Sequence, residues 1–219
     1  MLSDTHSPPE PPHQVEYGES KQLSLFMLYN QKNLDVAKFA GKSGRPELTG
    51  VFFTRDKTVA TDTFRLVEIS VPNNVKVSEF PASKKPVMQG VKPVIVGAEM
   101  LKKIKLRGDK NTPITNVLAI GHADQERVEF RTHDGSAMVF NRIEGTFPDY
   151  EKIFPKKKPR VEVSVNAEYL AGVIEQLGKL NSLNMVNIKI YDDGSPIVIE
   201  AKGNEQSGRA MVMPLRGDK

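Results

Sequence analysis

The stretch VEVSVNAEYLAGVIEQLGKL (161–180) contains the two patterns that decide the fold. Apolar and polar residues alternate over 161–165, which predicts a half-buried strand. Asn166 is a suitable helix N-cap, and residues 170, 173, 174 and 177 form one apolar stripe of an amphipathic helix. Gly178 offers a C-terminal stop. The stretch therefore predicts a strand followed at once by a helix.

Three more strands are expected after this helix, in MVNIKIY (185–191), SPIVIEA (195–201) and RAMVMPL (209–215). The same order of elements occurs earlier in the chain. In the second copy the strand PVIVG (93–97) leads into a helix over AEMLKKIKL (98–106), and three strands follow. We expect Met100, Leu101 and Ile104 on the apolar side of that helix.

The first copy is looser, with a strand over 23–29, a short helix over 31–40 and a strand over 47–54. The segment VATDTFRLVEI (59–69) forms the turn into its last strand. Two such strand–helix–three-strand modules make an α+β domain, with helices on one face of a continued antiparallel sheet.

The sequence therefore predicts four regions. They are a disordered, acidic, proline-rich tail (1–20), a complete domain of two modules (21–147), a linker (148–160) and a half domain of one module (161–219).

Composition excludes several classes of protein. The 219-residue chain has no cysteine, so it forms no disulfide, zinc-thiolate site or cysteine nucleophile. No apolar run approaches the ~20 residues that span a bilayer, and the N-terminus does not resemble a signal peptide. A cytoplasmic, nucleoid-associated protein without membrane contact is expected.

No catalytic or metal-binding pattern stands out. The four histidines lack metal-ligand spacing, and GKS (41–43) lacks the strand-to-helix context of a phosphate loop. No serine or carboxylate pair has a recognisable catalytic setting. We therefore expect no enzyme activity, no cofactor and no metal.

Basic residues are the more informative feature. Outside residues 1–20 the chain has 31 basic and 23 acidic residues, a balance of +8. Seven basic residues lie between Lys84 and Arg107 against one acid, Glu99. Such clusters suit phosphate contacts, although a solvated charged face is the alternative. Stacking aromatics are few, which favours duplex over single-stranded DNA. The predicted DNA-binding residues are Lys102, Lys103, Lys105 and Arg107.

Three segments resemble parts of the bacterial DNA polymerase III β subunit, the DNA sliding clamp. They are VATDTFRL (59–66), GTFPDYEKIFP (145–155) and AMVMPLR (210–216), and they occur in the family's order. The resemblance runs from about residue 22 to 216. It implies the clamp fold of paired βαβββ halves, in which a closed homo-oligomeric ring surrounds double-stranded DNA. It also implies a processivity factor for DNA replication, which tethers a DNA polymerase.

The resemblance further implies a pocket that binds peptides of DNA polymerases and clamp loaders. Its members, carried over from the three segments, are Thr61, Arg65, Leu66, Pro148, Lys152, Ile153, Met211, Val212, Met213, Pro214, Leu215 and Arg216. A groove of Leu, Ile, Met and Pro suits a short apolar peptide. The alternative from the residues alone is that these side chains fill a seam between sheets.

The chain departs from the family in two ways. Thr63 and Phe64 stand where the family keeps glycine and tyrosine or histidine. The family's first domain and the first half of its third have no counterpart, which favours a clamp-like scaffold or decoy that binds peptides without surrounding DNA. The basic residues favour the ring. A nucleic-acid-modifying enzyme is a further alternative, disfavoured by the lack of a catalytic constellation.

Overall fold

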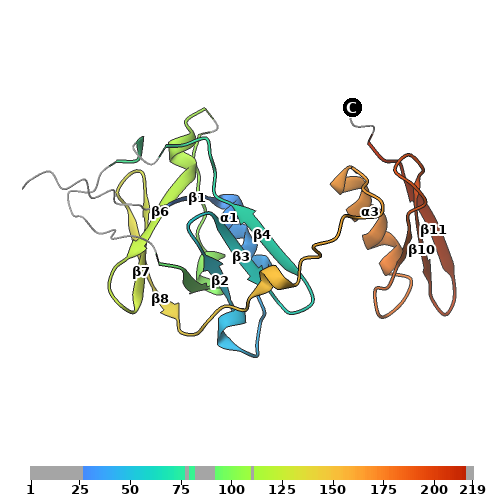
Figure 1. Cartoon of the computed structure of the whole chain (residues 1–219), viewed down its shortest axis with the longest axis horizontal. Helices are drawn as coiled ribbons and strands as arrows, with labels where there is room; N and C mark the ends of the chain where they lie inside the picture. The colour runs from blue at the N-terminus through green and yellow to red at the C-terminus, as the bar shows by residue number, and fades with distance from the viewer. Residues whose placement is uncertain (1–26, 77–78, 82–91, 110, 216–219) are drawn as a thin grey trace, which may run out of the picture. The chain divides into compact units, whose positions relative to one another are not determined.

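The structure, a computed structural model, describes residues 27–76, 79–81, 92–109 and 111–215 (Figure 1). The tail predicted over residues 1–20 lies outside this part of the chain. The fold divides into two compact units, Met1–Pro148 (unit 1) and Asp149–Lys219 (unit 2). No helix in the described ranges is long and apolar enough to cross a membrane.

Unit 1 repeats one order of elements. Its first module comprises β1 (Met27–Asn30), α1 (Gln31–Asp35), the 3-10 helices η1 (Val36–Phe39) and η2 (Pro46–Leu48), β2 (Gly50–Phe53), β3 (Lys57–Thr61) and β4 (Leu66–Ser70). Its second comprises β5 (Val94–Gly97), α2 (Ala98–Leu101), η4 (Pro113–Asn116), β6 (Val117–His122), β7 (Arg127–Thr132) and β8 (Ala137–Ile143). The predicted strand–helix–three-strand repeat is confirmed.

The two modules form one antiparallel sheet with the strand order β1-β6-β7-β8-β5-β2-β3-β4. The modules exchange strands, because β1 pairs with β6 and β5 pairs with β2. α1 and η1 pack on β3 and β4, and α2 packs on η1 and β2. The predicted α+β class, with helices packed on an antiparallel sheet, is confirmed.

The core of unit 1 lies between these helices and the sheet. Edge-to-face aromatic contacts run from Tyr29 to Phe53 and from Phe53 to Phe130, with ring centroids 5.2 and 5.7 Å apart. The Tyr29 hydroxyl donates to the Thr54 carbonyl at 2.6 Å, so this buried polar atom has a partner. Burial raises the pKa of Tyr29 above its ordinary value.

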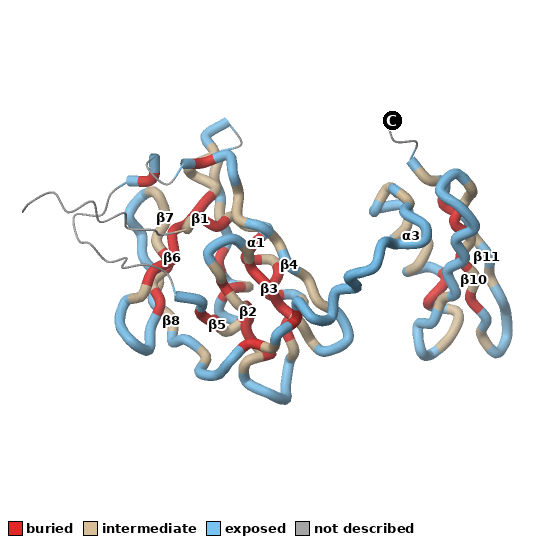
Figure 2. Tube along the Cα trace, viewed as in Figure 1, coloured by how far each residue is buried: buried red, intermediate tan, exposed pale blue. Residues whose placement is uncertain are grey.

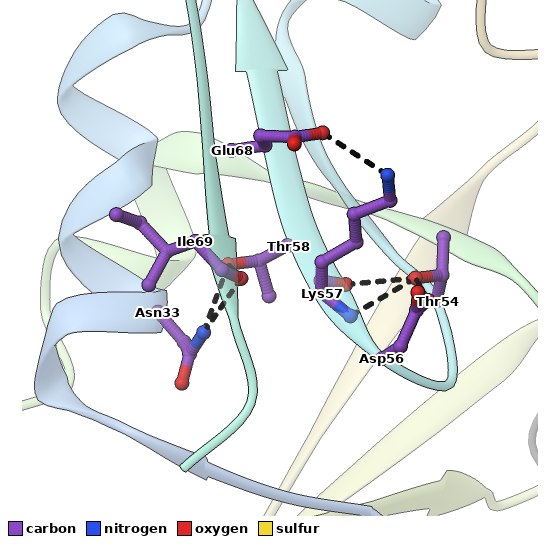
Figure 3. Close-up of polar contacts among 7 residues, drawn as sticks. All are labelled: Asn33, Thr54, Asp56, Lys57, Thr58, Glu68 and Ile69. Atoms are coloured by element: carbon purple, nitrogen blue, oxygen red, sulfur yellow. Dashed lines mark hydrogen bonds and ion pairs between the residues drawn. The ribbon is translucent and has the colours of Figure 1, made fainter. Parts of the chain in front are cut away.

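Asn33 is a fully buried polar residue within this core. Its side-chain amide donates to Thr58 Oγ1 at 3.2 Å and to the Ile69 carbonyl at 3.1 Å (Figure 3). It also donates to the Ser70 carbonyl at 3.0 Å. Its Oδ1 accepts from the Asn30 backbone N–H at 3.1 Å, which completes a capping box at the start of α1. One side chain thus fixes the helix to β3 and β4.

α2 is shorter than the helix predicted over residues 98–106, because it ends at Leu101. Leu101 and Ile104 are buried as expected, but Met100 is 47% exposed, so its predicted place on the apolar side was wrong. The helix tightens where it ends, because the N–H groups of Lys103 and Ile104 bond to the carbonyls three residues back, at 3.2 and 3.0 Å. Beyond this turn Gln31 Oε1 accepts the Leu106 N–H at 2.9 Å, a bond that a continued helix would direct to the carbonyl of residue 102.

Unit 2 contains η5 (Tyr150–Lys152), α3 (Ala167–Gly178), β9 (Asn187–Lys189), β10 (Ile197–Lys202) and β11 (Ser207–Val212). The Asn166 side chain accepts from the N–H groups of Glu168 and Tyr169, which confirms the predicted N-cap. The apolar side of α3 packs on the sheet β11-β10-β9 around the buried Ile199. Figure 2 shows residues 151–162 exposed along the chain that leads to this module.

Residues 161–165 belong to no strand, so the strand predicted there is wrong. A strand needs a neighbour that shares its backbone hydrogen bonds. Within the described part of unit 2, the one such bond recorded for this segment joins the Leu215 N–H to the Ser164 carbonyl at 2.7 Å. Residues 161–165 therefore have the alternating pattern of a strand, but no strand of the described residues pairs with their other edge.

Candidate functional site

The predicted DNA-binding residues follow α2, where the chain runs beside α1 and η1. Lys103, Lys105 and Arg107 are exposed. Lys102 is half-buried, with its Nζ 2.6 Å from Glu99 Oε1. Three of the four predicted cations are therefore directed to solvent, and the fourth is engaged with a neighbouring carboxylate.

Gln31 fixes the position of this segment. Besides accepting the Leu106 N–H, its Nε2 lies 3.5 Å from the Ile104 carbonyl and donates to Asp35 Oδ1 at 3.0 Å. Ile104 is buried beneath the segment. Lys105 therefore projects from a backbone that is anchored on both of its sides, at the Ile104 carbonyl and the Leu106 N–H.

Electrostatics identify two cations that the sequence reasoning missed. Lys102 lowers the pKa of Glu99 through its hydrogen bond, and the charges of Lys103 and Lys42 lower it further. Lys38 likewise lowers the pKa of Asp35 through a hydrogen bond, with help from Lys105. Lys38 and Lys42 therefore lie near the predicted residues. Lys42 belongs to the GKS loop, whose sequence showed no link to residues sixty positions away.

We use the name basic surface for the cations that these contacts bring together. They are Lys38, Lys42, Lys102, Lys103, Lys105 and the adjoining Arg107. The acids recorded among them, Asp35 and Glu99, are each paired with a lysine. Among the described residues no ion pair engages the remaining cations, which suit contacts with phosphate groups. Such contacts carry affinity without sequence preference.

The turn between β3 and β4 holds the first group of predicted peptide-site residues. Asp62 Oδ1 accepts from the N–H groups of Phe64 and Arg65 at 3.1 and 3.0 Å, and its Oδ2 accepts from Arg65 Nε at 2.8 Å. The Arg65 side chain lowers the pKa of Asp62, chiefly through this bond. Arg65 also lies 5.0 Å over the Phe39 ring. The guanidinium is thus held in place.

Thr63 and Phe64 form the tip of this turn. Thr63 has φ 78°, a left-handed backbone that is strained for a β-branched residue. Phe64 is 97% exposed and borders a cavity of about 490 Å³ between the turn and the loop at 41–48. Phe64 was not among the residues carried over to the peptide site, although the sequence places it in one wall of the predicted pocket. Its exposure gives the turn an apolar surface that a peptide side chain can contact.

The second group of predicted peptide-site residues lies in and after β11. Met211, Met213 and Leu215 are exposed, whereas Val212 packs into the core of unit 2 and presents no side chain to a ligand. Pro214 is half-buried. Arg216 lies outside the described residues. Alternation along the strand therefore leaves three of these apolar side chains available.

The remaining predicted members lie at the junction of the units. Pro148 is half-buried and ends unit 1. Ile153 is exposed, and the Lys152 ammonium pairs with Asp149 Oδ2 at 2.7 Å. The structure thus brings Thr61, Arg65 and Leu66 together in unit 1, and residues 211–215 together in unit 2.

No group of three histidine, aspartate or glutamate side chains could hold a metal ion in the part of the chain that the structure describes. The carboxylates at the site are instead engaged with lysine, arginine or backbone N–H groups. These features suit binding through charge and apolar contact.

Comparison of the structure with solved proteins identifies the fold. A DNA polymerase sliding clamp from Bacillus subtilis matches with a TM-score of 0.66 and 16% identity, over 94% of this chain and 51% of that one. The DNA polymerase III β chain from Streptococcus pneumoniae matches with a TM-score of 0.61 and 18% identity, over 86% and 49%. No protein-family model and no curated protein matches the sequence.

A third match is the sliding clamp from Pseudomonas aeruginosa bound to griselimycin, with a TM-score of 0.58, 17% identity, and coverage of 94% of this chain and 54% of that one. The chain therefore has the fold of bacterial DNA polymerase III β sliding clamps. It spans about half the length of the clamps it matches.

Proposed function

We propose, from the sliding-clamp fold, that this chain is a processivity factor that tethers a DNA polymerase to duplex DNA. The observation that carries the proposal is the basic surface, which lies on η1 and on the segments that follow η1 and α2 of a clamp fold, and which presents the exposed lysines at 103 and 105. Several copies form the ring. The chain holds DNA by topology and weak charge contact and performs no chemical step.

Retention on circular DNA tests this proposal. When a clamp loader places the chain on a nicked circular duplex, we expect it to remain bound through gel filtration at 0.15 M salt. A closed ring is linked to the circle, so salt that screens its phosphate contacts does not release it. The matched control is the same duplex cut once, from which the chain is expected to slide off.

Equal retention on the circular and the cut DNA would contradict topological tethering. If the chain is retained on neither the circular nor the cut DNA but still binds peptide, that result would support the second candidate function. This is a clamp-like scaffold that binds peptides of replication proteins without surrounding DNA, and the chain's match to only half of a clamp favours it.

We further propose that partners bind through short apolar peptides at the turn residues of unit 1 and at residues 211–215. Support comes from exposed apolar side chains on both segments, namely Phe64 at the turn and Met211, Met213 and Leu215 near the C-terminus. Peptide-binding grooves commonly present such side chains beside a few polar anchors. Arg65 and Lys152 are the polar anchors here.

The Met213→Asp variant tests the peptide site. Met213 is 59% exposed and lies beyond the end of β11, so its replacement leaves the core of unit 2 intact. A bound apolar peptide would bury the new carboxylate against an apolar surface, which is unfavourable. We therefore expect the affinity for a labelled apolar peptide from a polymerase, measured by fluorescence anisotropy, to fall by about tenfold or more.

The matched control for that variant is Val139→Asp, which places the same charge on an exposed position of β8. We expect its peptide affinity to equal that of the unaltered chain. Unchanged binding by Met213→Asp would remove residues 211–215 from the proposed site.

A further inference from the structure

The two modules of unit 1 join by a reciprocal exchange of strands. The first strand of each module pairs, antiparallel, with the second strand of the other. The register is the same in both contacts. Asn30, the N-cap of α1, faces Val117, the first residue of β6, and Gly97, the N-cap of α2, faces Gly50, the first residue of β2.

This exchange buries the centre of the domain. The residue before each N-cap, Tyr29 or Val96, faces the second residue of the partner strand, Leu118 or Val51. All four side chains have no solvent exposure. The fourth residues of those two strands, Ile120 and Phe53, are equally buried. In this fold, the second and fourth positions of a module's second strand are covered by the other module.

Unit 2 contains one module with the same order, and both of its exchange positions are open. Residues 161–165 precede the N-cap Asn166 and have the alternating pattern of a first strand. β9 is the second strand and, within the described residues, pairs with β10 along one edge only. Its second residue, Ile188, is 49% exposed, and Ile190, which follows the end of β9 where a fourth residue would stand, is 46% exposed.

These open positions match each other. Ile188 faces the buried Ile199 on β10, so it lies on the side of the sheet that carries the core. Val163 and Val165 pack against that same core. The register of unit 1 sets Val165 opposite the second residue of β9 and Val163 opposite the fourth. Both pairs would then be apolar and on the same face.

We propose that two copies of this chain pair through unit 2, and that residues 161–165 of each copy add to the open edge of β9 of the other. The contact repeats the exchange between the modules of unit 1 and assembles one complete clamp-like domain from two halves. A second copy is the partner that fits, because the two edges are complementary and a two-fold axis satisfies both at once. Open apolar edges of this kind promote strand pairing.

This interface rests on the proposed function, because a ring of several copies needs contacts that join one copy to the next. It is measurable without DNA, so the interface and the tethering function can fail separately. Copies that pair but are not retained on circular DNA would contradict the tether alone. Retention on circles by a chain that does not pair at this edge would contradict the interface alone.

Cysteine cross-linking tests the register, because the chain contains no cysteine. In a Val165→Cys/Ile188→Cys variant, facing residues of an antiparallel pair would place their Cα atoms about 4.5–5.5 Å apart, within reach of a disulfide. Within one chain, residue 165 and β9 flank opposite edges of the sheet β11-β10-β9, about 14 Å apart at ~4.8 Å per strand. We therefore expect mild oxidation to give a covalent dimer.

The matched control is Val165→Cys/Lys189→Cys. Lys189 is as exposed a position on the same strand, but its side chain points to the other face. We expect this control to cross-link at least tenfold more slowly on a non-reducing gel. Equal rates for the two variants, or a monomer from both, would overturn the proposed register.

Light scattering of the unaltered chain and of Ile188→Asp gives an independent measurement. We expect the unaltered chain to show at least twice its 24.4 kDa mass at tens of micromolar, and the variant to show a smaller assembly. Ile188 is half exposed within one copy, so the dissociated variant is expected to keep the circular dichroism spectrum of the unaltered chain. A monomer at these concentrations, or an assembly unaffected by the substitution, would overturn the interface.

Discussion

A Lys102→Glu/Lys103→Glu/Lys105→Glu variant is expected to bind duplex DNA on the order of a hundredfold more weakly at 0.1 M salt. Each lysine that neutralises a phosphate contributes about one unit to the slope of log affinity against log salt concentration. Lys103 and Lys105 are exposed, whereas Lys102 is paired with Glu99, so the loss of two such contacts lowers the slope by about two. Fluorescence anisotropy with a labelled duplex over a salt series measures both quantities.

The matched control is Lys156→Glu/Lys157→Glu/Lys158→Glu, which makes the same change of net charge in the exposed segment of unit 2 before α3. We expect a smaller loss of affinity and a smaller change of slope from this control. Equal effects would show that net charge matters and the basic surface does not. Because Lys103 and Lys105 are exposed, both variants should keep the circular dichroism spectrum of the unaltered chain.

An Asn33→Leu variant is expected to lower the free energy of unfolding of unit 1 by about 3 kcal/mol or more. Leucine has a similar volume but leaves Thr58 Oγ1 and the carbonyls of Ile69 and Ser70 without the amide donor they share. A buried polar group that loses its partner costs about 1–3 kcal/mol. The loss of the capping box adds to this cost.

Urea unfolding followed by circular dichroism measures that change as a shift of the midpoint at constant slope. Asn141→Leu, at an exposed position of β8, is the matched control and is expected to change stability by less than about 0.5 kcal/mol. A loss below about 1 kcal/mol from Asn33→Leu would show that water replaces the amide, and that the helix is not fixed to β3 and β4 by this residue.

Local patterns were sufficient to predict several elements of both units. Alternation with period two marks strands such as β7, and the N-cap Asn166 with its apolar stripe marks α3. The path of the chain after α2 could not be predicted, because Leu106 bonds to Gln31, 75 residues away. The buried amide of Asn33 gave no signal either, since its acceptors lie on β3 and β4.

In the candidate site, too, local features could be predicted from the sequence, and features that depend on contacts distant in sequence could not. The lysines around residue 103 stand out as a run, but Lys38 and Lys42 join them only through folding. The segment 161–165 has the pattern of a strand, yet a strand forms only where another edge pairs with it. The peptide site was found through short motifs whose members belong to two units, and it stays a prediction as a single pocket.

The hydrogen bond between Leu215 and Ser164 has a thermodynamic consequence. It joins the backbone that follows β11, where a partner peptide is proposed to bind, to the segment through which two copies are proposed to pair. A peptide that orders residues 213–215 would also order residues 161–165, and the two equilibria would be linked. Peptide capture would then tighten self-association, and self-association would tighten peptide capture by the same factor.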